Sequence, residues 1–319
     1  MAVALVLATL ATLDGQSPGS RPGSKPATRP TATELPHGWV TDYQQACTSA
    51  KAEGKDLLLG FVGYDWCEWC RRLRQEVFDN ESFQQRAPQV FVLVQVDSRR
   101  RQQGAALRKQ NRDLRQKFGI QAYPTIYLAD AAGRPYARTG YREVGPEIYL
   151  GHLLELQEIR KKRDDEFQKA ADAKGPERGR YLAAGLDALA RGIPLDDYLP
   201  IIDEILALDP DDKESLRTRF TEVKRRVARE AAMRRLTREV DALAAKKQWA
   251  EILVAVARFR KAQDPAGTML QQLLWIEATV HYEQDQKPQA RAKFEEVMKL
   301  DPNSDLGKQA NKALRSLGN

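Results

Sequence analysis

Hydrophobic residues between positions 37 and 160 follow two alternating kinds of spacing. The segments DLLLGFVG (56–63) and VFVLVQVD (90–97) are short apolar runs typical of buried strands. TIYLAD (125–130) and PYARTGY (135–141) alternate apolar and polar positions on either side of the turn AAGR. This alternation predicts an antiparallel hairpin.

Segments with helical spacing separate these strands. In the first of them, apolar residues recur every three or four positions and predict a helix: Trp39, Val40, Tyr43, Ala46, Cys47 and Ala50. Further helices are expected at 71–78, at 101–119, where Gly119 ends the pattern, and at 145–159, where a proline lies near the start. This order of elements predicts an α/β domain over residues 37–160, with a mixed central sheet flanked by helices on both faces.

Beyond a charge cluster at 160–166 the character of the chain changes. No strand pattern follows, so we expect residues 161–319 to form an all-α helical domain. Three of its helices end in similar Asp-Pro sequences: LALDPDD (206–212), KAQDPAG (261–267) and MKLDPNS (298–304). An apolar stripe along 216–243 is typical of a packing seam between antiparallel helices.

The N-terminal segment differs from both predicted domains. Residues 1–16 begin with the apolar run MAVALVLATLATL, which is too short for a standard membrane-spanning helix and predicts a signal peptide or an uncleaved anchor. Residues 17–36 are rich in Pro, Gly, Ser and Thr and predict a linker. We therefore expect an exported protein, periplasmic or in the cell envelope, with a possible membrane tether at its N-terminus.

Charge and composition exclude one class of partner. The net charge is +7, but Lys, Arg, Asp and Glu are interspersed along the helical segments, as expected for solvated helix faces. No basic run is interleaved with aromatic residues, so no nucleic-acid partner is expected. Only three cysteines are present, fewer than a secreted fold held together by disulfides would need.

Two of these cysteines, Cys67 and Cys70, form a Cys-x-x-Cys pair. Such a pair is found in zinc sites, structural bridges and redox centres. Here it directly follows a predicted buried strand and opens a helix. The N-terminus of a helix stabilises a thiolate, which makes Cys67 the expected nucleophile. Cys70, one turn later, would attack the mixed disulfide formed at Cys67 and release the substrate.

A zinc site would need two further ligands. The remaining candidates lack any paired metal-binding spacing: Cys47, His37, His152 and His281. We therefore expect no metal, and no cofactor other than the redox-active disulfide itself. Cys47 is interpreted as a small buried apolar residue, with a role as a third redox thiol as the alternative.

The sequences GYDWCEWC, QEVFDNESF and FGIQAYPTIYLADAAGRPYARTGY resemble the thioredoxin superfamily, and more narrowly its exported bacterial domains with a D-W-C-x-W-C motif. The resemblance covers about residues 37–160 and implies a thioredoxin fold. It also implies that Pro124 is a cis-proline beside the dithiol, and that Tyr123 and Pro124 hold the extended chain of the substrate. Trp66 would shield Cys67, and Gly140 would lie in the facing loop.

The chain departs from thioredoxins proper at two places. The strand before the dithiol carries Gly60 and Phe61 where a buried acid is expected, which leaves proton transfer to water, Asp65 or Glu68. Between the cysteines stands Glu68-Trp69 in place of Gly-Pro. A carboxylate at Glu68 disfavours the Cys67 thiolate, whereas Arg71 and Arg72 favour it, so the sign of their combined effect stays open.

The C-terminal segment 274–303 resembles a tetratricopeptide repeat, with the best match over 271–304. Small and large residues alternate between its two helices, and a proline follows the second: Ala278, Tyr282, Ala290, Phe294 and Pro302. The segments 248–265 and 181–212 are candidate further copies. Such arrays recruit partners on a concave surface, although these helices could also only pack on each other.

These expectations combine into a hypothesis and two rivals. The hypothesis is an exported thiol–disulfide oxidoreductase that acts on protein thiols and disulfides, favours the reductase direction and works with a redox partner protein. One rival is a non-enzymatic scaffold or assembly protein, in which the thioredoxin fold and the helices are docking modules. The other is an adaptor whose dithiol controls what the repeats bind.

Overall fold

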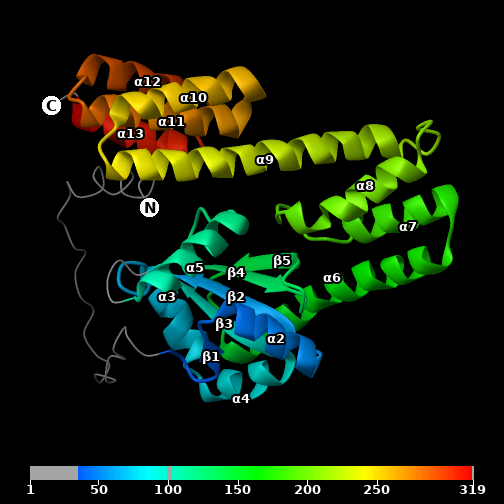
Figure 1. Cartoon of the computed structure of the whole chain (residues 1–319). Helices are drawn as coiled ribbons and strands as arrows, with labels where there is room; N and C mark the ends of the chain where they lie inside the picture. The colour runs from blue at the N-terminus through cyan, green and yellow to red at the C-terminus, as the bar shows by residue number, and fades with distance from the viewer. Residues whose placement is uncertain (1–34, 99–102, 318–319) are drawn as a thin grey trace. The chain divides into compact units, whose positions relative to one another are not determined.

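The computed structural model describes residues 35–98 and 103–317, which fall into two units (Figure 1). The first unit ends at Ala228, and the second begins at Arg229. The predicted signal peptide or anchor (1–16) and residues 17–34 of the predicted linker lie outside the described residues. In the part of the chain that the structure describes, no helix combines the length and the apolar character needed to span a bilayer.

The first unit is built on a five-stranded mixed sheet with the strand order β1-β3-β2-β4-β5. The strands have these bounds: β1 Trp39–Val40, β2 Asp56–Val62, β3 Phe91–Asp97, β4 Thr125–Ala129 and β5 Pro135–Gly140. β2 runs parallel to β3 and antiparallel to β4, and β4 and β5 form the expected antiparallel hairpin. Every residue of β2 is buried, as the continuous apolar run predicts for a central strand.

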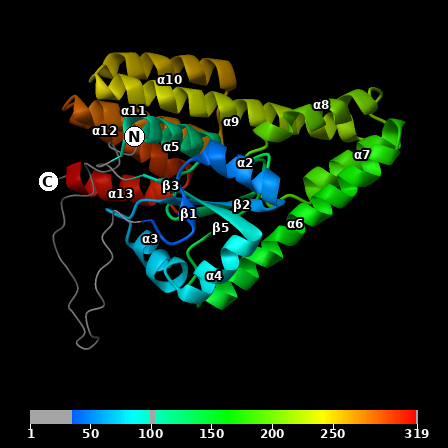
Figure 2. The same cartoon turned by 60° about the horizontal axis from the view of Figure 1, so that its bottom comes forward.

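Helices cover both faces of this sheet (Figure 2). Their bounds are α2 Tyr43–Glu53, α3 Glu68–Leu73, α4 Glu81–Val90, α5 Ala105–Lys117 and α6 Pro146–Asp172, with a π-helical turn η1 Arg74–Phe78 that continues α3. On one face Phe61 of β2 packs against Phe118, just after α5, and on the other Trp39 packs against Phe78 of η1. The mixed sheet with helices on both faces is thus confirmed.

Two elements differ from the sequence prediction. The first helix begins at Tyr43 rather than at residue 39, because the side chain of Asp42 caps it by accepting a hydrogen bond from the backbone N–H of Gln45. Trp39 and Val40 instead form β1, which pairs with β3. The sequence prediction also missed α4, whose only buried side chains are Phe83 and Ala87. Two buried positions are too few to produce a clear helical period.

The division between the units does not coincide with the boundary expected at residue 160, which falls inside α6. One residue of the charge cluster there, Arg163, is buried, and its guanidinium lies 3.0 Å from the carboxylate of Asp130. The core of the first unit continues from the sheet into three further helices and a short 3₁₀ turn: α7 Gly175–Asp187, η2 Asp196–Tyr198, α8 Leu199–Leu208 and the start of α9 Leu216–Ala245.

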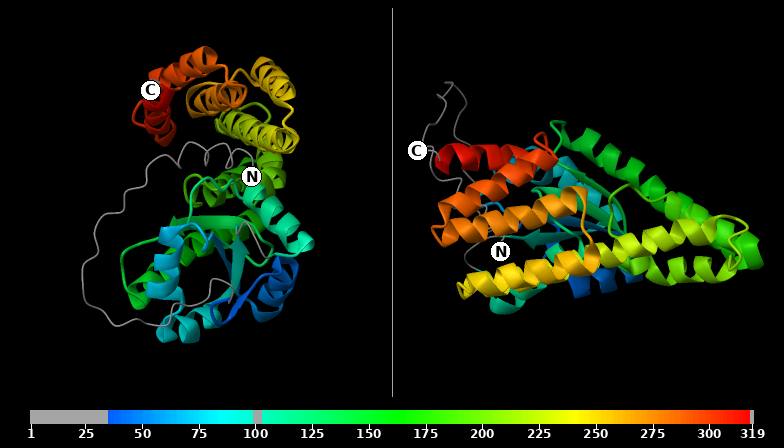
Figure 3. Two further views of the ribbon diagram at one scale, coloured as in Figure 1. Left: turned by 90° about the vertical axis from the view of Figure 1, so that its left-hand side faces the viewer. Right: turned by 90° about the horizontal axis from the view of Figure 1, so that it is seen from above.

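The second unit consists of the remainder of α9 and four helices (Figure 3): α10 Trp249–Gln263, α11 Gly267–Glu283, α12 Lys287–Leu300 and α13 Asp305–Leu317. As the repeat-like pattern predicts, Ala278, Ala290 and Phe294 are fully buried, and the ring of Trp275 packs against Phe294. The three Asp-Pro sequences each follow the last residue of a helix, because a residue that precedes proline avoids the helical conformation. The apolar stripe of α9 is buried, with its first part in the core of the first unit and its later part in that of the second.

Candidate active site

The two cysteines of the Cys-x-x-Cys pair lie where the loop after β2 meets α3. Cys67 is the N-cap residue of this helix, and the backbone N–H of Cys70 donates a hydrogen bond to the Cys67 Sγ at 3.1 Å. The two sulfurs form a disulfide. Cys67 is 6% exposed and Cys70 is fully buried. Of the two cysteines, Cys67 is therefore the more exposed, and its role as the nucleophile stays a prediction.

The charged residues next to the pair are engaged with different partners. The carboxylate of Glu68 lies 3.4 Å from the guanidinium of Arg72, at the surface of α3. Arg71 instead donates a hydrogen bond to the backbone carbonyl of Tyr64, at 3.2 Å, and so ties α3 to the loop that precedes the dithiol. Arg71 thus holds the backbone near Cys67, whereas the charge of Glu68 is balanced at the surface.

A cis peptide bond joins Tyr123 to Pro124 beside the disulfide. The ring of Tyr123 packs against the cluster that contains both cysteines and meets the edge of Trp66, with 5.0 Å between ring centroids. Gly140, at the end of β5, lies next to Pro124: a Cβ on Gly140 would stand only 3.1 Å from the carbonyl oxygen of Pro124. The predicted site residues therefore come together around the disulfide, and Gly140 allows the close approach of the facing strand.

Ser98 belongs to the same cluster and was missed by the sequence analysis. It follows β3 directly, and its N–H donates to the carbonyl of Val62 at 2.7 Å. Its hydroxyl donates to the Tyr123 hydroxyl at 3.0 Å, and its carbonyl accepts from the Trp66 indole N–H at 3.4 Å. The ends of neighbouring parallel strands meet at one sheet edge, which is the signal that could have identified Ser98.

Aromatic side chains are exposed next to the dithiol. Trp69 is 52% exposed, which places it on the surface rather than as a cap of the core. Its ring lies 5.4 Å from that of Tyr141, and the guanidinium of Arg72 stands 5.0 Å above it. The Tyr141 hydroxyl donates to the carboxylate of Glu76 at 2.7 Å, and this hydrogen bond raises the pKa of Tyr141.

The position where thioredoxins proper carry a buried acid is apolar. Phe61 packs against Phe118 and Tyr127 there. The acid of β2 is Asp56, at the opposite end of the strand, where its carboxylate accepts hydrogen bonds from Tyr136 and Gln157. Asp65 and Glu68, the alternatives for proton transfer, are both exposed.

Within the described residues, no group of three or more His, Cys, Asp or Glu side chains is arranged to hold a metal ion. Cys47 is a partly buried free thiol, and burial raises its pKa. Its sulfur lies near the hydroxyl of Tyr43 at the turn formed by Gly133.

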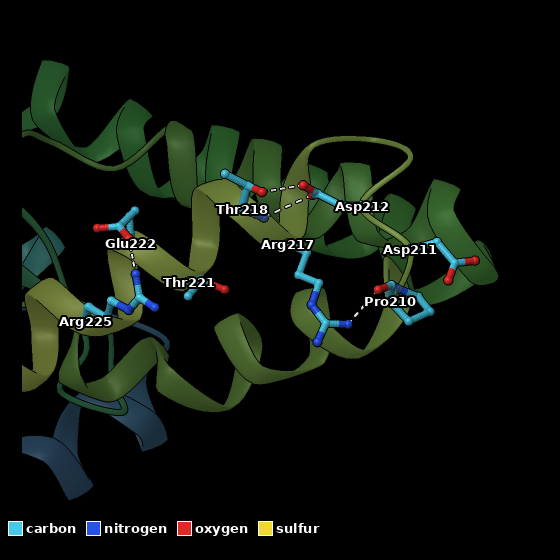
Figure 4. A pocket seen from close by; sticks show the side chains of 8 residues that line it. All are labelled: Pro210, Asp211, Asp212, Arg217, Thr218, Thr221, Glu222 and Arg225. Carbon is cyan, nitrogen blue, oxygen red and sulfur yellow. Dashed lines mark hydrogen bonds and ion pairs between the residues drawn. The ribbon is translucent and has the colours of Figure 1, made fainter.

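A separate open hollow lies at the corner between α8 and α9 (Figure 4). Its polar side chains are already engaged with their neighbours: Arg217 donates to the carbonyl of Pro210, and Arg225 to the carboxylate of Glu222. The hollow shares no residue with the dithiol cluster, and none of the residues that line it is a cysteine.

His152 of α6 makes stability sensitive to pH. Its Nε2 lies 3.0 Å from the hydroxyl of Thr139 and 3.5 Å from the guanidinium of Arg142. Partial burial lowers the pKa of His152 from 6.5, and Arg142 adds to this, while Glu155 opposes it. As the pH falls below about 6.5, the unfolded chain therefore binds a proton before the folded one does.

We expect the free energy of unfolding of the first unit to decrease as the pH falls from 7.5 to 5.5, and His152→Gln to reduce this decrease. Urea unfolding at the two pH values measures the difference. Arg142→Gln should also reduce the decrease, because it removes the cation that opposes protonation. An unchanged pH dependence in both variants would contradict the assignment to His152.

Comparison with known proteins agrees with this geometry. Residues 43–155 match the family model of the thioredoxin-like domain. The disulfide bond reductase DsbH of Chlamydia pneumoniae is 26% identical over 119 residues, 37% of this chain and 72% of that protein. The thioredoxin-related protein DsbJ of the same organism is 31% identical over 174 residues, 50% of this chain and 49% of that protein.

A solved structure of a DsbH oxidoreductase is 25% identical and has a TM-score of 0.37, with coverage of 44% of this chain and 96% of that chain. The chain spans about half the length of DsbJ and about three quarters of that of DsbH. The matched segment contains the disulfide, the cis-proline and the strands β2 to β5, but not β1. This protein thus contains a thioredoxin-like domain, followed by a helical C-terminal region.

Proposed function

We propose that this protein is an exported thiol–disulfide oxidoreductase that reduces disulfides in protein substrates. The observation that carries the proposal is the position of the two sulfurs: Cys67 caps α3 and is the more accessible, while Cys70 is fully buried one turn later. The amide of Cys70 points at the Cys67 sulfur and would stabilise its thiolate. A helix N-terminus adds to this stabilisation.

In the proposed reaction the Cys67 thiolate attacks one sulfur of the substrate disulfide. A mixed disulfide forms, and the other substrate sulfur leaves as a thiolate and takes up a proton. Cys70 then loses its proton and attacks the Cys67 sulfur, which releases the second substrate thiol and forms the Cys67–Cys70 disulfide. Two electrons pass from the dithiol to the substrate, and a dithiol on a redox partner protein restores the reduced form.

The surroundings of the sulfurs support a polypeptide substrate. The backbone at Tyr123 and Pro124 lies beside the disulfide, and the exposed rings of Trp66 and Trp69 flank it. We propose that the substrate chain lies along Tyr123 and Pro124 and contacts Trp66. The reductase direction is supported by the name of the relative DsbH, a disulfide bond reductase.

We propose that the helices from Arg229 onward recruit the substrate or the redox partner. The repeat-like burial of small and large residues on α11 and α12 supports this role. We also propose export to the periplasm or cell envelope, on the basis of the apolar N-terminal run. The same run could serve as the tether.

The test is the redox equilibrium of the dithiol. The full chain is equilibrated with mixtures of reduced and oxidised glutathione, and free thiols are trapped and counted by mass spectrometry. We expect rapid exchange and a potential near the reducing end of the thioredoxin-like range, about −270 mV. A much more oxidising value would indicate an oxidase or isomerase. A disulfide that does not exchange within hours would contradict the proposal and favour the scaffold.

A further inference from the structure

Arg74 is an unusual buried cation in the helical segment that carries the dithiol. It is 6% exposed and is the first residue of η1, one turn after Cys70. Its backbone N–H donates to the carbonyls of Cys70 and Arg71. A buried guanidinium is costly unless other groups compensate its charge, so its partners define what it does.

Two groups contact the guanidinium of Arg74. The Nε of Arg74 donates to both carboxylate oxygens of Asp79, at 3.2 and 3.0 Å. The guanidinium carbon lies 5.3 Å from the ring centroid of Tyr64, in a cation–π contact. The Asp79 side chain is more exposed than that of Arg74, since it lies at the C-terminal end of η1.

Tyr64 connects this cation to the redox centre. It is buried in one small cluster with Val62, Cys67 and Cys70. Side chains four residues apart on a helix are also neighbours, with about 5–6 Å between their Cβ atoms, which places Arg74 close to Cys70. The guanidinium of Arg74 thus contacts the ring of Tyr64, which itself packs in the cluster that contains both cysteines.

Charge near a dithiol affects its two redox states unequally. The disulfide is neutral, whereas the reduced pair carries a thiolate, so a buried cation stabilises the reduced form and a carboxylate destabilises it. Arg74 and Asp79 therefore act in opposite directions. Because Arg74 is buried, its effect should exceed that of an exposed arginine, and the effect of the partly exposed Asp79 should be smaller.

We propose that the ion pair between buried Arg74 and partly exposed Asp79 sets the redox equilibrium of the Cys67–Cys70 dithiol, with Arg74 favouring the reduced form and Asp79 limiting that effect. Arg74 is a positioning residue in this scheme, because it acts on the sulfurs through Tyr64 and the local field. The proposal rests on the proposed thiol–disulfide exchange.

The experiment measures the equilibrium constant with glutathione for the full chain and three variants. Arg74→Gln should shift the equilibrium about fivefold toward the disulfide, which corresponds to about 20 mV. Asp79→Asn should shift it about threefold toward the dithiol. Arg74→Lys keeps the charge and should stay within about twofold of the wild type.

The opposite signs separate an electrostatic role from a structural one. Arg74→Gln and Asp79→Asn both break the same ion pair. If the pair were only structural, both variants would therefore shift the equilibrium with glutathione in the same direction. Asp79 is partly exposed, so Asp79→Asn changes a less buried position than Arg74→Gln does and leaves Arg74 in place. The shift of the Asp79→Asn variant toward the dithiol therefore tests the proposal even if Arg74→Gln fails to fold.

Arg72→Gln is the matched control, because Arg72 lies on the same helix but is exposed and paired with Glu68. We expect a shift below twofold. An effect as large as that of Arg74→Gln, or shifts of the same sign in Arg74→Gln and Asp79→Asn, would overturn the inference while leaving the proposed function intact. A wild-type dithiol that does not exchange at all would overturn both.

Discussion

Cys67→Ser is expected to abolish disulfide reduction, whereas Cys70→Ser should attack once and then accumulate as a mixed disulfide with its substrate. The reason is the unequal access of the two sulfurs. Cys67 is the more exposed of the pair and lies at the start of α3. Cys70 is fully buried and reaches only a disulfide already formed at Cys67.

The measurement follows reduction of insulin with a chemical thiol as the electron source, together with non-reducing gels of the trapped species. The rate with Cys67→Ser should fall to that of the uncatalysed reaction. A covalent complex should appear only with Cys70→Ser. These outcomes assign the nucleophile and the resolving thiol separately.

Cys47→Ser provides the control. Cys47 forms no disulfide, is partly buried, and has a pKa raised by burial, so the variant should keep full activity. Residual turnover in Cys67→Ser, or a covalent complex in Cys67→Ser instead of Cys70→Ser, would contradict the assigned roles. A loss of activity in Cys47→Ser would indicate a third redox thiol.

Arg163→Met is expected to destabilise the first unit by about 3–5 kcal/mol, because it removes one member of a buried ion pair. Arg163 is 1% exposed, and its guanidinium lies 3.0 Å from the carboxylate of Asp130 and donates to the Tyr198 hydroxyl at 2.7 Å. In the variant, Asp130 would stay buried, and among the described residues Arg134 would be its remaining cationic partner.

Urea unfolding of the full chain, followed by hydrogen exchange of the β4 and β5 backbone, measures this effect where Asp130 lies. The control is Arg180→Met, which breaks a pair with Glu214 at 3.0 Å between two exposed or half-buried side chains. That change should cost no more than about 1 kcal/mol. Equal losses in both variants would show that the Arg163 pair contributes no more than a surface contact.

The same contacts explain why the first unit extends beyond residue 160. The Tyr198 hydroxyl donates to the carbonyl of Pro135 in β5, and the N–H of Ala190 donates to the carbonyl of Tyr136. Lys117 of α5 also lies 2.9 Å from Asp197. The segment 160–228 therefore completes the first unit, although its helical pattern alone groups it with the helices that follow.

The local signals in the sequence were sufficient for much of the fold and for the centre of the site. The run before Cys67 is apolar throughout, and a strand of that kind is buried whatever its neighbours are. The pair Cys67 and Cys70 opens a helix, and Pro124 precedes a strand, so both positions followed from short stretches of chain. That Pro124 lies beside the two cysteines was expected from the family resemblance alone, and in the structure these residues do lie together.

Only the tertiary structure decided the features that depend on distant partners. Trp39 and Val40 form a strand because β3 offers an edge more than fifty residues later. Arg163 is buried because Asp130 and Tyr198 bind its guanidinium, whereas its neighbours Lys161, Lys162 and Asp165 are solvated, as is usual for charge clusters. Arg74 likewise looks like one of several surface arginines in the sequence. Its burial, and therefore its effect on the dithiol, depends on Tyr64 and on the π-helical turn that brings Asp79 to it.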